Sequence, residues 1–395
     1  MRKVVVVGAG LAGLSAAAEL RRAGWDGKLI IIGGEEHRPY RRPPLSKDYL
    51  TSDVSPLLEF SQADEVDAEW RLGQWATQLD LTERTIRVAG GDDTTFDGLV
   101  IATGASARET PPRLTHDRVV ALRDLDDAVR VRDGLISSER VLVLGGGFLG
   151  TEIAAAANLL GKEVTLVERM SQPLLTAVGA TIGKEVAHLH RTHGVDVLLD
   201  AEIAHVFGRR DTAYAHFRDG SMVTADLVVA ALGSTPAVSW LQGSGLRVED
   251  GVVLDGKGLA APGVTAAGDV ARWPHPLLDD ELVRVEHYSN AIDQGRRAAR
   301  ALLGDRLQAG PPPIPSFWSH QYDWRLHSVG FTGSRFDFRM VDHDATGRLL
   351  GEYRHQGRLV GAITNRRPRT LLPYRQQLLD ATQSTSGRPA LKAVP

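Results

Sequence analysis

The sequence predicts an α/β fold that contains two Rossmann-like, dinucleotide-binding domains. Three observations predict it. A strand, a glycine-rich turn, a helix and a second strand follow one another near residue 3, and the same order returns near residue 140. Both turns have the spacing G-x-G-x-x-G, which is typical of folds that bind dinucleotides. In both copies an acidic residue follows the second strand, where a ribose would be held.

The first copy lies within residues 3–35. A strand over Lys3–Val7 is predicted to precede the turn Gly8–Gly13, a helix through Ala23 and a second strand over Lys28–Ile32. A glycine pattern alone could mark only a tight turn, but strand, helix and acid together favour a nucleotide site. Glu35 follows the turn by about twenty residues, where a carboxylate can bind ribose hydroxyls; Glu36 is the less favoured neighbour. The expected nucleotide contacts are Gly8, Gly10, Leu11, Ala12, Gly13 and Glu35.

The second copy lies within residues 140–168 and repeats the first. The predicted strands are Arg140–Leu144 and Glu163–Val167, with a helix through Leu160 between them. Glu168 would hydrogen-bond a 2′-hydroxyl and repel a 2′-phosphate, so we expect NADH to be preferred over NADPH. Arg169 leaves the alternative open, because an arginine there could bind a phosphate. The expected NADH contacts from this turn and strand are Gly145, Gly147, Phe148, Leu149, Gly150 and Glu168.

Composition limits the other functions. The chain has 395 residues, a net charge of −3 and no cysteine. The charge gives no reason to expect binding to nucleic acid or to a membrane surface. Without cysteine there is no disulfide, no Cys-x-x-Cys redox pair and no protein-ligated iron–sulfur cluster. We also expect no bound metal. No apolar run reaches the length of a membrane span, so we expect a cytoplasmic protein.

Three further segments read as apolar strands that end in small residues. Val100–Gly104 and Val228–Gly233 each end in a turn that allows close approach of the backbone to a cofactor, although each could be an ordinary buried strand. Gly263–Asp269 ends in Gly-Asp, which suits a carboxylate that accepts a hydrogen bond from a polyol. Together with the glycine turns, this favours the ribityl chain of FAD. The expected contacts here are Thr103, Gly104 and Asp269 for FAD and Gly233 for NADH.

Three specific motifs occur in order along the chain. They are Pro39–Lys47 (PYRRPPLSK), Arg284–Ala291 (RVEHYSNA) and Phe317–Tyr322 (FWSHQY). With the two glycine turns they resemble the oxygenase-coupled ferredoxin reductases of the two-dinucleotide-domain flavoprotein superfamily. The resemblance implies an FAD domain over 1–108 and 226–305, an NADH domain over 109–225 and a C-terminal α+β interface domain over 306–383. Residues 384–395 are expected to be a disordered tail.

The resemblance also implies roles for single residues. Lys47 would lie beside flavin N5 and pair with Glu152, and Trp318 would lie near the exposed flavin edge. Further FAD contacts are implied at Arg42, Ala76, Arg123, Glu286 and His287. Each has a plainer alternative: Lys47 and the arginines could be solvated, Glu152 could sit at a helix start, and Trp318 or His287 could be packed. The chain departs from the usual pattern at Thr176, Tyr288 and His320.

The implied reaction passes electrons from NADH through FAD to a small acidic ferredoxin, which accepts one electron at a time. Opposite charge speeds such an encounter, so a basic docking surface is expected. Arg296, Arg297 and Arg300 are the candidate docking residues, and Arg366, Arg367, Arg369 and Arg375 form a second cationic run. Either run could be only a solvated face. We expect a monomer or a weak dimer, but nothing in the sequence marks a self-complementary surface that would fix the oligomeric state.

Two other classes of function use the same fold. NADH oxidases, peroxidases and disulfide reductases that need a redox-active cysteine are excluded by the cysteine-free sequence. A cysteine-free oxidase that makes peroxide remains a weaker alternative. The second is a flavin-bound NADH sensor resembling apoptosis-inducing factor, in which slow reduction changes association. Slow turnover with every ferredoxin would favour that alternative.

Overall fold

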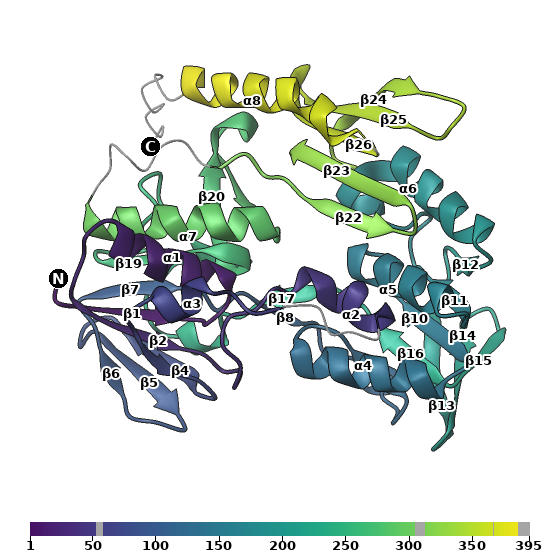
Figure 1. Cartoon of the computed structure of the whole chain (residues 1–395), viewed down its shortest axis with the longest axis horizontal. Helices are drawn as coiled ribbons and strands as arrows, with labels where there is room; N and C mark the ends of the chain where they lie inside the picture. The colour runs from purple at the N-terminus through teal and green to yellow at the C-terminus, as the bar shows by residue number, and fades with distance from the viewer. Residues whose placement is uncertain (53–57, 305–312, 366, 386–395) are drawn as a thin grey trace.

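The computed structural model describes residues 1–52, 58–304, 313–365 and 367–385. Figure 1 shows two parallel-sheet domains side by side, with the C-terminal segment along one side of both. The first domain has a five-stranded parallel sheet in the order β19-β7-β1-β2-β3. Its strands are β1 (Lys3–Val7), β2 (Lys28–Ile32), β3 (Glu69–Arg71), β7 (Gly98–Ile101) and β19 (Val264–Ala266).

Helices α1 (Leu11–Arg22) and α7 (Tyr288–Leu303) pack against each other on this sheet, although about 270 residues separate them in the sequence. A three-stranded antiparallel sheet, β4 (Trp75–Asp80), β5 (Thr85–Ala89) and β6 (Thr94–Thr95), completes the other side. A second small sheet pairs β18 (Val252–Val253), β20 (Ala271–His275) and β21 (Glu281–Arg284). The first domain is therefore built from two stretches of chain.

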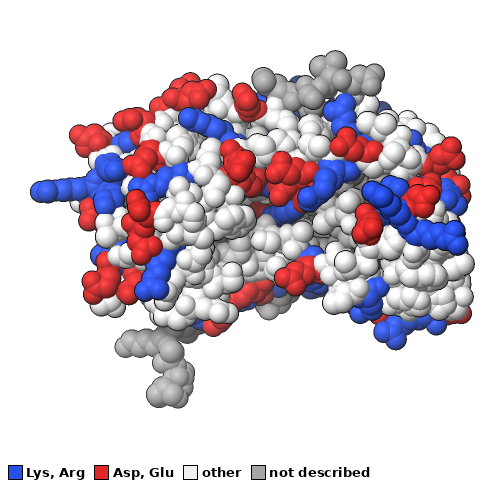
Figure 2. All heavy atoms as spheres, turned by 90° about the horizontal axis from the view of Figure 1, so that it is seen from below, with Lys and Arg blue, Asp and Glu red and all other residues white. Residues whose placement is uncertain are grey.

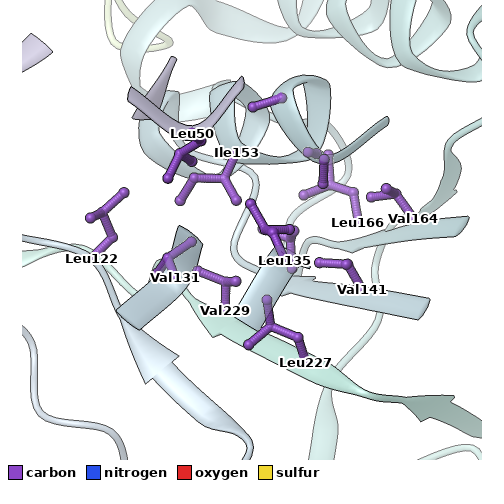
Figure 3. Close-up of a cluster of buried hydrophobic side chains, with 14 of the residues drawn as sticks. Leu50, Leu122, Val131, Leu135, Val141, Ile153, Val164, Leu166, Leu227 and Val229 are labelled. Carbon is purple, nitrogen blue, oxygen red and sulfur yellow. The ribbon is translucent and has the colours of Figure 1, made fainter. Parts of the chain in front are cut away.

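The second domain repeats the parallel sheet in the order β12-β11-β10-β16-β9. Its strands are β9 (Val119–Ala121), β10 (Arg140–Leu144), β11 (Glu163–Val167), β12 (Asp196–Leu198) and β16 (Leu227–Ala230). Helices α4 (Leu125–Ser137) and α5 (Phe148–Leu159) bury their apolar side chains on it, and Figure 3 shows Ile153, Val131 and Leu135 among the strand residues of this core. A hairpin sheet, β13 (Ile203–Arg209), β14 (Thr212–Phe217) and β15 (Met222–Ala225), covers the opposite face.

The expected boundary at residue 226 is wrong. Strand β16 lies between β10 and β9 in the second sheet, so residues 227–230 belong to the second domain. The chain crosses between the domains where β8 (Ala105–Ala107) pairs with β17 (Ser234–Pro236). An apolar run shows that a strand is buried but not which sheet it joins, and this is why the boundary fell about eight residues early.

The C-terminal domain is an antiparallel sheet in the order β22-β23-β26-β25-β24, followed by a helix, α8 (Leu372–Thr385). The strands are β22 (Trp318–Gln321), β23 (Trp324–Gly330), β24 (Asp337–His343), β25 (Leu349–His355) and β26 (Arg358–Asn365). Helix α6 (Leu175–Thr192) of the second domain packs its apolar face into the core of this sheet. The predicted tail starts too early, since α8 continues to Thr385; residues 386–395 lie outside the described part of the chain.

Candidate functional site

Several of the predicted FAD contacts follow four strands of the first sheet. Because parallel strands end at the same edge, the turns after β1, β2, β7 and β19 lie together there. Gly8 follows β1, Glu35 follows β2, Thr103 and Gly104 follow β7, and Asp269 follows β19. The Thr103 hydroxyl donates to the Ala237 carbonyl at 2.8 Å, which ties this edge to the crossing strand β17. Ala76 lies further out, on β4.

The first glycine turn is tight on its sheet side and open on its outer side. Gly8 has a φ of +116°, and a Cβ there would lie 2.0 Å from the Ala102 carbonyl oxygen. A Cβ on Gly13 would lie 2.0 Å from the Gly8 oxygen. At Gly10, where α1 begins, no atom lies within 4 Å of an added Cβ. The free N–H groups of this helix start therefore face open space, which fits a pyrophosphate.

The acidic residue after β2 lies among donors. Glu35 accepts a hydrogen bond from the Tyr40 hydroxyl at 2.6 Å and forms an ion pair with Arg42. Arg42 also donates to the Arg123 carbonyl at 2.8 Å. Arg42 thus lies at the ribose end of the expected site, beside Glu35.

Arg123 and Asp269 form an ion pair at the same edge, with Arg123 Nη2 at 3.0 Å from Asp269 Oδ2. Arg123 Nε donates to the Ala105 carbonyl at 2.8 Å, which fixes the guanidinium. Burial raises the pKa of Asp269 above its usual range, and Arg123 opposes that rise. The two predicted FAD residues therefore lie together, where a cationic and an anionic group can meet a pyrophosphate and a polyol.

The second glycine turn repeats the geometry of the first, with a Cβ on Gly150 meeting the Gly145 oxygen at 1.8 Å. Glu168 lies beneath this turn. Its carboxylate accepts hydrogen bonds from Gly146 N at 2.6 Å and from Met170 N at 2.8 Å. Arg169 is exposed. The carboxylate is thus held in place by main-chain donors, while the arginine beside it is not buried.

Lys47 and Glu152 are brought together across the domain boundary. Lys47 Nζ lies 2.5 Å from Glu152 Oε2, and the Glu152 residue is only 6% exposed. Ser46 donates to the same oxygen at 2.6 Å, and Ser319 donates to Oε1 at 2.7 Å. Glu152 is the fifth residue of α5, beyond its first turn, and within the described residues it makes no capping contact with the helix start, so the alternative of a helix-start residue is not supported.

A cavity of about 320 Å³ is lined by residues of all three domains. Phe148 of the second glycine turn lines it, together with Glu286, His287 and Phe317. Burial lowers the pKa of His287 to about 4, so this imidazole is neutral at neutral pH. Glu286 accepts from the Ser234 hydroxyl and is paired with Arg284 at 2.5 Å. Trp318 packs edge to face on Tyr288, with ring centroids 5.5 Å apart.

The predicted docking residues do not share one surface, and for Arg297 the prediction is wrong. Arg297 is 7% exposed and stacks over the Trp273 ring at 5.2 Å. It lies three residues after the buried Gln294, on the face of α7 that packs inward. Arg300 pairs with the buried Glu19 at 2.6 Å, and Arg296 is exposed.

In the second run Arg367 pairs with Asp342 and Asp344, while Arg366 lies outside the described residues. Figure 2 shows Lys and Arg intermixed with Asp and Glu over the face seen from below. That face therefore carries no broad patch of a single sign.

Sequence reasoning missed the Ser46 and Ser319 hydroxyls that contact Glu152, and His190, which is linked to Glu152 only through other side chains. Ser319 and Gln321 stand at alternate positions of β22, inside the FWSHQY motif, so the alternation of a strand could have placed them on one face. His190 on α6 carried no signal, because it lies in no motif. The described residues contain no cluster of His, Asp or Glu arranged to hold a metal ion. They also contain no helix with the length and apolar character to cross a membrane.

Comparison with known proteins identifies the family. Residues 2–295 match the model of the pyridine nucleotide-disulphide oxidoreductases. The chain belongs to this family. The family and the relatives use FAD and NAD(H), and the protein is an FAD-dependent oxidoreductase. The family, the fold class and the two cofactors expected from the sequence are confirmed.

The relatives are similar over most of their length. A ferredoxin–NAD(P)(+) reductase from a Sphingomonas species is 33% identical over 90% of this chain and 88% of its own. A putidaredoxin reductase from Pseudomonas putida is 32% identical over 83% of this chain and 80% of its own. The structure of the covalent putidaredoxin reductase–putidaredoxin complex matches with a TM-score of 0.88 at 29% identity, over 99% of this chain and 97% of that one.

Proposed function

We propose that the protein is an NADH:ferredoxin oxidoreductase that supplies electrons to an oxygenase, such as a haem monooxygenase. The observation that carries the proposal is the largely buried Lys47–Glu152 pair, which joins the two nucleotide-binding domains. The similarity to reductases of putidaredoxin and other ferredoxins supports the choice of acceptor. The cysteine-free sequence leaves the chain no thiol of its own for the disulfide chemistry after which the family is named.

We infer that the first domain holds FAD. The open side of the Gly8–Gly13 turn would receive the pyrophosphate, Glu35 would bind the adenosine ribose, and Asp269 would bind the ribityl chain. Bound FAD can take a hydride from NADH and release the two electrons one at a time. The residues of the chain position the reactants and set the charge around them.

The second domain holds NADH in the same way. Glu168 is fixed by Gly146 N and Met170 N, so its free lone pairs can accept from the ribose and its charge repels a 2′-phosphate. The nicotinamide would enter the cavity lined by Phe148, Glu286 and His287. His287 is neutral at neutral pH and adds no positive charge to this cavity.

The ferredoxin would meet the exposed edge near Trp318, with Arg296 contributing positive charge. Arg296 is exposed on α7, the helix that begins at Tyr288, the residue that contacts Trp318. Arg297 is not part of this surface because it is buried.

The proposal is tested by NADH-dependent reduction of cytochrome c, with and without added ferredoxins of the [2Fe–2S] type. We expect the rate to depend on the ferredoxin and to saturate with it. A rate that no ferredoxin increases, together with NADH-dependent association of the protein, would favour the sensor alternative. Parallel assays with NADPH report on the cofactor preference.

A further inference from the structure

Glu152 stands at the end of a buried chain of hydrogen bonds that starts on another helix. The Ser319 hydroxyl donates to Glu152 Oε1 at 2.7 Å, and Gln321 Nε2 donates to Ser319 Oγ at 3.1 Å. Gln321 Oε1 in turn lies 3.0 Å from His190 Nε2. Ser319, Gln321 and His190 are 1%, 3% and 0% exposed, so water does not compete for these contacts.

The carboxylate fixes the direction of every bond in this chain. A carboxylate only accepts, so the Ser319 proton points to Glu152 and its lone pairs are left for a donor. The Gln321 amide must therefore turn its NH₂ toward Ser319 and its oxygen toward His190. That oxygen needs a donor, which places the His190 proton on Nε2 and leaves Nδ1 to accept from the Tyr322 hydroxyl at 3.5 Å. Burial lowers the pKa of His190 to about 4, consistent with a neutral ring that carries this one proton.

The fold explains why these groups meet. Ser319 and Gln321 alternate along β22 and point to the same side, toward α5 and α6, while Trp318 and His320 point to the other side. His190 lies in the last turn of α6, whose apolar residues pack into the core of the C-terminal sheet. The Tyr322 ring stacks on His193, one turn further along, at 3.7 Å. The C-terminal domain thus contacts the Lys47–Glu152 pair through one strand.

We propose that Gln321 and His190 are positioning residues that hold the Ser319 hydroxyl on Glu152 and so keep Glu152 in place against Lys47. Neither residue needs to touch FAD or NADH. Their effect passes through the carboxylate to the lysine, whose charge acts on bound FAD. This inference rests on the proposed placement of FAD next to Lys47.

The test measures the midpoint potential of FAD in the loaded protein. Gln321→Leu removes the donor to Ser319, so the Ser319 hydroxyl no longer holds Glu152 in place against Lys47. The carboxylate then offsets less of the Lys47 charge, and the midpoint potential of FAD should shift upward. In the Glu152→Gln background the same substitution should cause no shift, because it acts only through that carboxylate. His190→Leu should shift the potential in the same direction, whereas His190→Gln, which keeps an N–H donor, should leave it at the parent value.

Thr364→Val is the matched control. Thr364 is fully buried in β26 of the same sheet. Its hydroxyl donates a hydrogen bond to the Leu349 carbonyl and contacts none of Glu152, Ser319, Gln321 and His190. It should lower thermal stability without moving the potential. If Gln321→Leu does not retain FAD, the two His190 variants carry the test.

Two results would overturn the inference. In the first, Ser319→Ala shifts the midpoint potential while Gln321→Leu and His190→Leu do not. Gln321 and His190 would then have no part in positioning Glu152. In the second, the shift of Gln321→Leu is equally large in the Glu152→Gln background. Lys47→Met distinguishes a failure of this inference from a failure of the proposed FAD site. If Lys47→Met leaves the midpoint potential of FAD unchanged, the lysine does not act on the flavin, and the positioning role of Gln321 and His190 fails with it.

Discussion

Lys47 Nζ lies 2.5 Å from Glu152 Oε2, and this pair joins the two nucleotide-binding domains at a point where both residues are largely buried. Lys47 is the last residue of the PYRRPPLSK motif of the first domain, and Glu152 is the fifth residue of α5, the helix that begins within the second glycine motif. A hydroxyl from the C-terminal domain completes the arrangement. All three parts of the chain therefore meet at one carboxylate.

Breaking this pair should cost both stability and rate. Lys47→Met leaves Glu152 as a buried charge without its partner, which should lower the free energy of unfolding by about 3–5 kcal/mol. The double variant Lys47→Met/Glu152→Gln should regain part of that loss, because no unpaired charge remains. Urea unfolding of the FAD-loaded proteins measures both. If the single and double variants are destabilised equally, the Lys47–Glu152 ion pair does not contribute to the free energy of unfolding as expected.

Glu168 should control the choice of nicotinamide cofactor. Glu168→Ala removes both the acceptor for the ribose hydroxyl and the charge that repels a 2′-phosphate, so the ratio of kcat/KM for NADH over NADPH should fall about tenfold or more. Arg169→Ala is the control next to it, and should change the ratio in the opposite direction or not at all. If Arg169→Ala instead abolishes NADPH turnover and Glu168→Ala changes nothing, the assignment of the ribose contact is wrong.

Acid should destabilise the protein through buried histidines. Burial lowers the pKa of His190, His275 and His287 to about 4, against 6.5 for an unburied ring. Between these values the unfolded chain binds more protons than the folded one, so stability falls as the pH drops from about 6.5 to 4. His275→Asn keeps an acceptor for Leu277 N but does not titrate. Its melting temperature should therefore depend less on pH in this window; an unchanged slope would exclude His275 as a contributor.

Two adjacent arginines should behave differently. Arg296→Glu reverses an exposed charge near the proposed docking edge, so the KM for an acidic ferredoxin should rise several-fold at low salt while the rate of FAD reduction by NADH stays the same. Arg297→Met removes a buried cation stacked on Trp273, and should change the melting temperature instead of the KM. The salt dependence of KM is the measurement. A larger effect on KM from Arg297→Met would contradict its buried position.

Sequence patterns predicted the two nucleotide-binding units closely. Strands Lys3–Val7 and Arg140–Leu144 have the predicted bounds, and helix α1 ends one residue before the predicted Ala23. These units are local, because glycine turns and apolar runs act on residues near them in the chain. The juxtaposition of Lys47 and Glu152 came from the resemblance and not from any pattern within the chain.

Other features depend on contacts that no local pattern reports. Arg297 looks like its neighbour Arg296, but the helix rotates about 100° per residue and turns it toward Trp273. The buried positions of α7 form a helical stripe that includes Asn290, Gln294, Arg297 and Ala301. Three of these residues are polar, so a pattern of apolar residues does not show the stripe. The contact of His190 with Gln321 joins residues 131 positions apart. Such pairings appear only once the C-terminal sheet is packed on α6.

The central claim is that electrons pass from NADH through FAD to a ferredoxin. Anaerobic stopped-flow mixing of the FAD-loaded protein with NADH, followed by a second mixing with oxidised ferredoxin, tests it most directly. The account predicts fast bleaching of the flavin absorbance by NADH, slower bleaching in Lys47→Met, and return of the absorbance only when ferredoxin is added. A reduced protein that persists with every ferredoxin offered would contradict the account.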